Sequence, residues 1–133
     1  MNPQRAHVVV VNDNPDFLEL MADLLQDERY PTTIIDGDRE DAVDLIRAAS
    51  PQVLIIDLRL GQGELHGWEV MKEVRSDRSL RDLPTLICTG DLEALAKLES
   101  EVAAMRRVAT LTKPFSVEAL LTALEDLTAR EPA

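Results

Sequence analysis

The sequence of 133 residues lacks features that mark several large classes of protein. Its single cysteine, Cys88, excludes an internal disulfide framework and any cysteine-based zinc site. No apolar run approaches the roughly 20 residues that a membrane-spanning helix needs. The block Val8–Val11 is too short for the core of a signal peptide. We therefore expect a soluble, cytoplasmic protein.

Positive charge is also scarce: 14 Lys and Arg residues face 25 Asp and Glu residues, which gives a net charge of −11. So acidic a surface repels phosphate backbones and anionic lipids, which makes nucleic acids and membranes poor partners. The content of 45% hydrophobic and 29% charged residues is typical of a globular protein. With no repeat or linker in sight, we expect one domain over residues 1–133, with a core at about 6–128, and Met1 suggests a complete chain.

The apolar pattern predicts five strands that alternate with five helices. Three of the strands are apolar without alternation, which is typical of strands buried on both faces. The expected strands are His7–Val11, Thr32–Ile35, Val53–Ile56, Thr85–Cys88 and Val108–Leu111. Stripes of apolar residues at helical spacing follow them, within Phe17–Leu25, Ala42–Ala49, Val70–Val74, Leu92–Val102 and Leu120–Leu127. Expected N-caps are Asn14 or Asp13, Asp91 and Ser116. This alternation predicts an α/β domain with a parallel sheet covered on both faces.

Polar side chains follow four of the predicted strands, where ligands bind in a doubly wound sheet. The first strand is followed by Asn12 and Asp13, the third by Asp57, the fourth by Thr89 and the fifth by Lys113. Two carboxylates, a hydroxyl and an ammonium at one edge suit a hard cation together with a phosphoryl group. Carboxylate oxygens hold Mg²⁺, while lysine and threonine contact phosphoryl oxygens.

Each of these residues also has a purely structural interpretation. Asp13 is placed to cap a helix, Thr89 is a common type of strand terminus, and Lys113 can be a surface lysine before a loop. Asp57 is harder to explain in this way, because it directly follows the apolar run Val53–Ile56. The functional interpretation depends on the coincidence of all four.

The stretches around these residues resemble the receiver domains of two-component response regulators, in particular stand-alone, chemotaxis-regulator-like receivers, over nearly the whole chain. They read VVVVNDNP at 8–15, VLIIDL at 53–58, LPTLICTG at 83–90 and LTKPF at 111–115. The resemblance implies a flavodoxin-like, doubly wound five-stranded parallel sheet of order 2-1-3-4-5 with five helices on two faces. It makes Asp57 the phosphoryl acceptor, Thr89 the switch hydroxyl and Lys113 the partner of the phosphoryl group, after a cis bond to Pro114.

The resemblance also implies a cofactor and partners. Mg²⁺ would be held by Asp13, Asp57, the backbone carbonyl of Arg59 and, through a water, Asn12. The donor would be a histidine kinase or a His phosphotransfer protein in a phosphorelay. An output partner would bind the surface at about Asp91–Leu127. The domain is not a conventional enzyme, although it would catalyse its own phosphorylation and dephosphorylation, and a homodimer is left open.

Three positions depart from the family pattern. Asn12 replaces the first carboxylate of the usual acidic pair. Gly67 stands ten positions after Asp57, where the family commonly has its glycine at eight, so the loop over 58–67 is longer than usual. It holds Gly61, Gly63 and Gly67, so we expect it to be flexible or to need positive φ. The extra length is either a neutral surface insertion or a change in donor access. Thr110 occupies the position of a common aromatic, so we expect output without an aromatic switch.

Two other functions remain as alternatives. One is an interaction module of the same fold that acts without phosphorylation, which Asn12 and Thr110 favour. The other is a Mg²⁺-dependent phosphatase with an Asp nucleophile. Such enzymes use an acid two residues beyond the nucleophile, where this chain has Pro15 or Arg59.

The Asn12→Asp variant is expected to bind Mg²⁺ more tightly than the natural chain, because it restores a third carboxylate near the cation. A Mg²⁺ titration followed by the fluorescence of Trp68 measures this affinity. An unchanged dissociation constant in the variant would show that the amide is not what limits metal binding.

Overall fold

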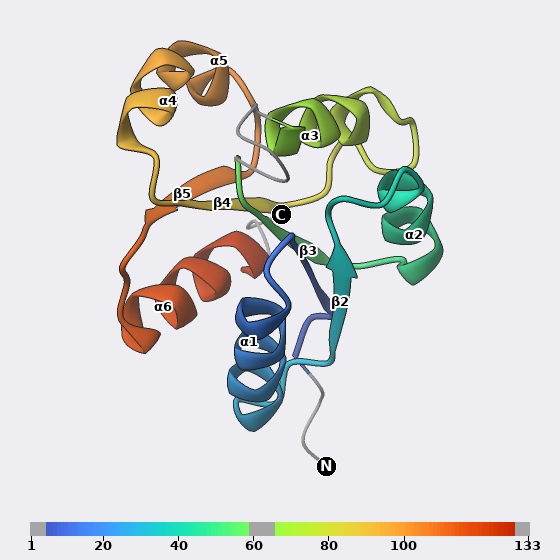
Figure 1. Ribbon diagram of the computed structural model, residues 1–133, viewed down its shortest axis with the longest axis vertical. Coiled ribbons are helices and arrows are strands. Elements are labelled where there is room, and N and C mark those ends of the chain that lie inside the picture. Colours follow the sequence, from blue (N-terminus) through green and yellow to red (C-terminus); the bar gives the residue numbers. More distant parts are fainter. Residues whose placement is uncertain (1–4, 59–65, 130–133) are drawn as a thin grey trace.

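The fold is seen in a computed structural model, which describes residues 5–58 and 66–129. Five parallel strands form one sheet of order β2-β1-β3-β4-β5, as predicted (Figure 1). The strands are β1 Val8–Asn12, β2 Thr32–Asp36, β3 Val53–Ile56, β4 Thr85–Thr89 and β5 Val108–Thr112. Four of them therefore run one residue further than predicted and end on a polar residue, which brings Asn12 and Thr89 into the sheet.

Six helices cover the sheet in the part of the chain that the structure describes. They are α1 Pro15–Asp27, α2 Ala42–Ala49, α3 His66–Ser76, α4 Leu92–Lys97, α5 Glu99–Ala103 and α6 Val117–Thr128. Figure 1 shows α1 and α6 on one face of the sheet and the other four on the opposite face. Within 5–58 and 66–129, none of the helices has the length and apolar character needed to cross a bilayer.

The fourth predicted helix is divided in two, so the helix count is six in the described residues instead of the expected five. The division falls at Leu98, whose backbone (φ −99°, ψ 2°) leaves the helical range, ends α4 and begins α5. No proline or glycine marks this point in the sequence. Residues of both short helices, together with Thr110 of β5, line a groove on this side of the sheet.

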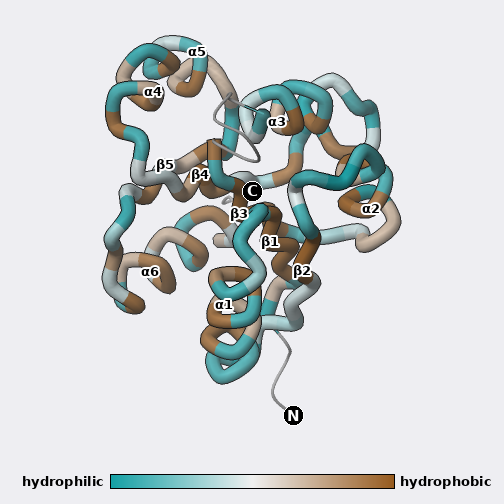
Figure 2. Tube along the Cα trace, in the orientation of Figure 1, coloured by the Kyte–Doolittle hydropathy of each residue, from teal (hydrophilic) through white to brown (hydrophobic). Residues whose placement is uncertain are grey.

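The central strands are buried on both faces, as their unbroken apolar runs predict. In β1, Val8 and Val10 pack in the layer under α1 and α6, whereas Val9 and Val11 pack under α2 and α3. All four are at most 1% exposed. Figure 2 shows the apolar strands at the centre of the molecule, with helices of mixed hydropathy around them. The three central strands β1, β3 and β4 are therefore held between two layers of apolar side chains.

Short polar side chains start the helices next to the strand ends. The Asn14 side-chain oxygen accepts hydrogen bonds from the backbone N–H groups of Asp16 (2.9 Å) and Phe17 (3.2 Å), with Pro15 in the first turn. Asn14, and not Asp13, is thus the N-cap of α1. The predicted caps Asp91 and Ser116 are confirmed, since each accepts from a backbone N–H in the first turn of its helix, at 2.9 and 3.0 Å.

Helix α6 is held by Leu124, which is fully buried against the sheet. We expect Leu124→Ala to lower the free energy of unfolding by about 2–5 kcal/mol, because it removes buried apolar surface and leaves a cavity. Leu20→Ala makes the same chemical change at a position 61% exposed and is expected to cost less than about 0.5 kcal/mol. Urea unfolding of the two variants measures the difference, and equal losses would contradict this packing.

Candidate functional site

The side chains of Asp57 and Lys113 form an ion pair at the carboxyl edge of the sheet. Asp57 is the first residue after β3, and Lys113 is the first after β5. The Lys113 ammonium donates to Asp57 Oδ2 at 2.7 Å, although β4 lies between their strands. The two side chains are only 28% (Lys113) and 14% (Asp57) exposed. A charge that loses water is costly when alone, and here two opposite charges lie in direct contact and offset that cost.

Two further contacts, and a cis peptide bond to the next residue, are found at Lys113. Its backbone N–H donates to the carbonyl of Thr89 at 2.9 Å. The bond from Lys113 to Pro114 is cis, as the resemblance predicts. Its ammonium also lies 4.3 Å from the centroid of the Phe17 ring. The charge is therefore held by Asp57 and covered by an aromatic ring.

Phe17 is the residue of this site that the sequence analysis placed only in a helix stripe. A weak signal was available, because the chain has only four aromatic residues and this one lies one helical turn after Asp13. Its contact with Lys113 joins segments at opposite ends of the chain, and nothing in the local pattern reports such a contact.

Thr89 ends β4 beside this pair and is only 1% exposed. Its Oγ1 accepts a hydrogen bond from the backbone N–H of Asp91 at 3.1 Å. A hydroxyl has one donor hydrogen as well as two acceptor lone pairs, so this bond leaves the O–H of Thr89 able to donate. The hydroxyl thus connects the carboxyl edge of β4 to the residue that caps α4.

Asn12 and Asp13 lie at the end of the neighbouring strand. Strands β1 and β3 are paired, with Val11 opposite Ile56, so Asp13 and Asp57 leave the sheet at the same edge. Asn12 is 3% exposed, and its Oδ1 accepts from the backbone N–H of Asn14 at 2.9 Å. The amide is therefore built into the turn that leads to α1.

The donor set at this edge fits Mg²⁺. Two carboxylates supply hard oxygen ligands, and the second lone pair of the Asn12 amide oxygen can accept from a metal-bound water. The predicted carbonyl ligand Arg59 lies outside the described residues. Within the described ranges no three His, Cys, Asp or Glu side chains form a metal-binding group. A cation here therefore needs carbonyl and water oxygens in addition to Asp13 and Asp57.

Gly67 packs directly on the backbone of the site. A Cβ placed on it would overlap the carbonyl of Asp57 and lie 2.8 Å from the carbonyl oxygen of Leu58. The next residue, Trp68, donates its N–H to that Leu58 oxygen at 3.3 Å. The φ of Gly67 is outside the left-handed region, so close approach to the backbone is what requires glycine at this position. The rest of the expected longer loop lies outside the described residues.

Cys88, next to Thr89, behaves as a packing residue. It is 1% exposed, and burial raises the pKa of its thiol to about 11, an effect that the charge of Lys113 opposes and that of Asp57 reinforces. The thiol is therefore protonated near neutral pH, and the reactive thiolate is scarce.

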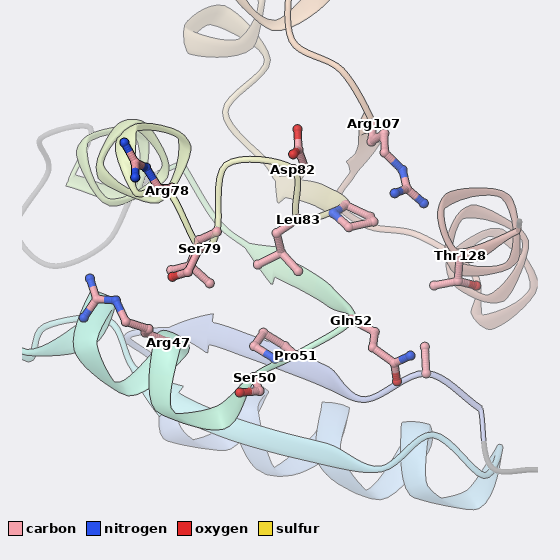
Figure 3. Close-up of a pocket in the computed structure, with 13 residues that line it drawn as sticks. Arg47, Ser50, Pro51, Gln52, Arg78, Ser79, Asp82, Leu83, Arg107 and Thr128 are labelled. Carbon is pink, nitrogen blue, oxygen red and sulfur yellow. The ribbon is translucent and has the colours of Figure 1, made fainter. Parts of the chain in front are cut away.

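A pocket of about 680 Å³ lies at the opposite end of the sheet, among residues that precede β3, β4 and β5 (Figure 3). Two of its arginines have structural partners. Arg47 pairs with Asp44 at 2.8 Å and with Asp77, and Arg107 donates to the Leu127 carbonyl at 3.4 Å. Arg47 and Arg107 thus sit at the carboxyl ends of α2 and α6, where cations are favourable. The pocket is remote from Asp57, at the other end of β3.

The amino-acid sequence of the chain matches a known family. The family model of the response regulator receiver domain covers residues 8–125 of the chain. The protein therefore belongs to the response regulator receiver family of two-component signalling.

Two curated relatives illustrate the similarity. The polar-differentiation response regulator DivK of Brucella ovis is 31% identical over 115 residues, which cover 83% of this chain and 85% of DivK. The nitrogen assimilation regulatory protein NtrX of Azorhizobium caulinodans is 29% identical over 120 residues, or 89% of this chain. The chain spans only about a quarter (25%) of the length of NtrX.

Solved structures agree with the fold. The chemotaxis protein CheY4 of Vibrio cholerae matches with a TM-score of 0.76 and 27% identity, over 92% of this chain and 98% of CheY4. The receiver domain of the sensor histidine kinase PA1611 from Pseudomonas aeruginosa matches with a TM-score of 0.71 and 23% identity, over 94% of this chain and 98% of that domain. In the PA1611 structure a magnesium ion is coordinated in the active site cleft.

Replacement of Gly67 by alanine is expected to displace the Asp57 backbone and to lower the free energy of unfolding by about 1–3 kcal/mol or more, because the added methyl overlaps a carbonyl. Gly90→Ala is the matched control, since a Cβ there meets its nearest neighbour, the Lys113 Cβ, at an ordinary 3.7 Å. Urea unfolding and the amide NMR shift of Asp57 report on the two variants. A Gly67→Ala protein as stable as Gly90→Ala would contradict the close contact.

Proposed function

We propose that Asp57 accepts a phosphoryl group from a histidine kinase or a His phosphotransfer protein, and that this modification switches a partner-binding surface. The observation that carries the proposal is the 2.7 Å ion pair between Asp57 and Lys113, beside the buried hydroxyl of Thr89. Asp57 thus places a carboxylate at the ligand-binding edge of a doubly wound sheet. The Lys113 ammonium, which can neutralise a phosphoryl oxygen, is already in contact with it. Membership of the receiver family supports the same assignment.

The chemistry follows from these groups. A carboxylate oxygen of Asp57 attacks phosphorus, the bond from phosphorus to the donor nitrogen breaks, and its electron pair returns to the donor imidazole. The product is an acyl phosphate on Asp57. Lys113 offsets the repulsion between the anionic nucleophile and the anionic donor, then pairs with a phosphoryl oxygen. The O–H of Thr89 donates to another oxygen of the product.

Asp13, Asp57, the backbone carbonyl of Arg59 and, through a water, Asn12 would hold Mg²⁺ in this site. When bound, the cation neutralises charge that develops between nucleophile and phosphoryl group. The need is strong in a chain of net charge −11, which repels anionic donors. The magnesium in the PA1611 receiver, which shares the fold, supports this part of the proposal.

The output surface that we propose is the face of α4, β5 and α6, at about Asp91–Leu127. It includes a groove of about 370 Å³ in which apolar side chains predominate, lined by Leu92, Leu95, Ala96, Glu99, Val102, Ala103 and Thr110. The hydroxyl of Thr89 bonds to the N–H of Asp91 at the start of α4. When the hydroxyl turns to a phosphoryl oxygen, its bond to the Asp91 N–H changes. The start of α4, which contributes Leu92 to the groove, then moves and changes the shape of the groove. Thr110 stands where the family commonly has an aromatic residue, and it is small and exposed. Output in this chain then depends on the movement of α4 and not on an aromatic side chain at position 110.

An interaction module that acts without phosphorylation is the second candidate. It is favoured by Asn12, whose amide is committed to the turn before α1 and brings no charge to the metal site. The phosphatase alternative has less support, since Pro15 occupies the first turn of α1 where a catalytic acid is needed.

Incubation with Mg²⁺ and acetyl phosphate is expected to add one phosphoryl group to the natural chain, as intact-protein mass spectrometry would show. Asp57→Asn should gain none, since an amide cannot form the acyl phosphate, and EDTA should prevent the gain in the natural chain. Asp36→Asn is the matched control, because this exposed carboxylate ends β2 at the same edge of the sheet. A chain that stays unmodified with both acetyl phosphate and a histidine kinase would favour the interaction module instead.

A further inference from the structure

We infer that Phe17 is a positioning residue for phosphoryl transfer: its ring holds the Lys113 ammonium at Asp57. The inference rests on the proposed function and adds a residue to it. Phe17 has no group that reacts with a phosphoryl donor, so it acts only through Lys113.

The geometry carries this inference. The Lys113 Nζ is 4.3 Å from the centroid of the Phe17 ring and 2.7 Å from Asp57 Oδ2. A cation within about 6 Å of a ring centroid, over the ring face, is attracted by the negative potential of that face. Lys113 is 28% exposed, so solvent weakens the attraction less than it does on an open surface.

The ring itself is well fixed. Phe17 lies in the first turn of α1, where its backbone N–H bonds to the Asn14 cap at 3.2 Å, and Pro15 sets the direction of the chain at the start of the helix. Its side chain packs against the core layer of α1 and α6. A rigid ring at this point limits the positions that the flexible lysine side chain can take.

The position of the lysine is important in this particular site. A lysine has four rotatable side-chain bonds, and its head group must stay at the carboxyl edge before the donor arrives. Asn12 contributes no negative charge, so less electrostatic attraction draws the ammonium to the site than in a site with three carboxylates. The Phe17 ring supplies attraction without any charge that would repel the donor phosphate.

The test compares three variants in phosphorylation by acetyl phosphate at saturating Mg²⁺, followed by mass spectrometry. Phe17→Leu keeps an apolar side chain but loses the ring face, and we expect it to react about two- to five-fold more slowly than the natural chain. Phe17→Tyr keeps the ring and should react at about the rate of the natural chain. Phe115→Leu removes the other phenylalanine of the same core layer, which has no cation over its ring in the described part of the chain, and should react normally.

A double-mutant cycle separates positioning from simple packing. In a Lys113→Ala background, Phe17→Leu should have no further effect on the rate, because the group that the ring holds is absent. A second readout needs no phosphorylation: in NMR spectra the Lys113 ε-protons should lose an upfield ring-current shift in Phe17→Leu and keep it in Phe17→Tyr.

The outcomes are distinct. A natural chain that no donor phosphorylates overturns the proposed function, whatever the NMR shift shows. If the natural chain is phosphorylated, two results overturn the role of Phe17 alone. One is a Phe17→Leu variant that reacts as fast as the natural chain. The other is a Phe17→Leu change that slows the reaction by the same factor with and without Lys113. Slower reaction of Phe17→Leu that depends on Lys113, with rescue by tyrosine, supports the role of Phe17.

Discussion

The ion pair between Asp57 and Lys113 is the interaction on which the site depends. It joins the ends of β3 and β5 across the intervening β4, so it forms only if the sheet has its order and each strand ends at the right residue. The core on both faces of β1, β3 and β4 holds these central strands in place. The pair in turn leaves only 28% of the Lys113 side chain and 14% of the Asp57 side chain exposed to water. Under the proposed function, the pair holds Lys113 where a phosphoryl group on Asp57 would need it.

Much of the fold was predictable because its signals are local. Unbroken apolar runs indicate buried strands, and Asn14, Asp91 and Ser116 are common helix caps, so most element bounds agree with the structure. The strand order, which the structure confirms, was implied by the family resemblance and not by these local signals. The division of the fourth helix at Leu98 was not predictable, since no proline or glycine precedes it and the apolar stripe continues through it. Local propensity alone does not decide between one long helix and two short ones.

The site was predictable to the extent that it lies at strand ends. Because parallel strands deliver their carboxyl ends to one edge, Asp57 and Lys113 were expected to meet, and the structure places them 2.7 Å apart. The roles proposed for Asp13, Asn12 and Arg59 in metal binding stay predictions. Contacts made by Phe17 and Gly67 escaped the analysis because both depend on tertiary packing. A ring over a distant lysine and a backbone that leaves no room for a methyl group have no local sequence pattern.

The hydrogen bond from Trp68 to Leu58 has a consequence for how the domain tolerates changes in length. The bond, with Gly67 against the Asp57 carbonyl, ties both ends of the connection between β3 and α3 to the same few backbone atoms. Two extra residues between these points cost only about 0.2 kcal/mol in closure entropy. A change in length between Leu58 and Gly67 is therefore expected to leave the position of Asp57 unaltered.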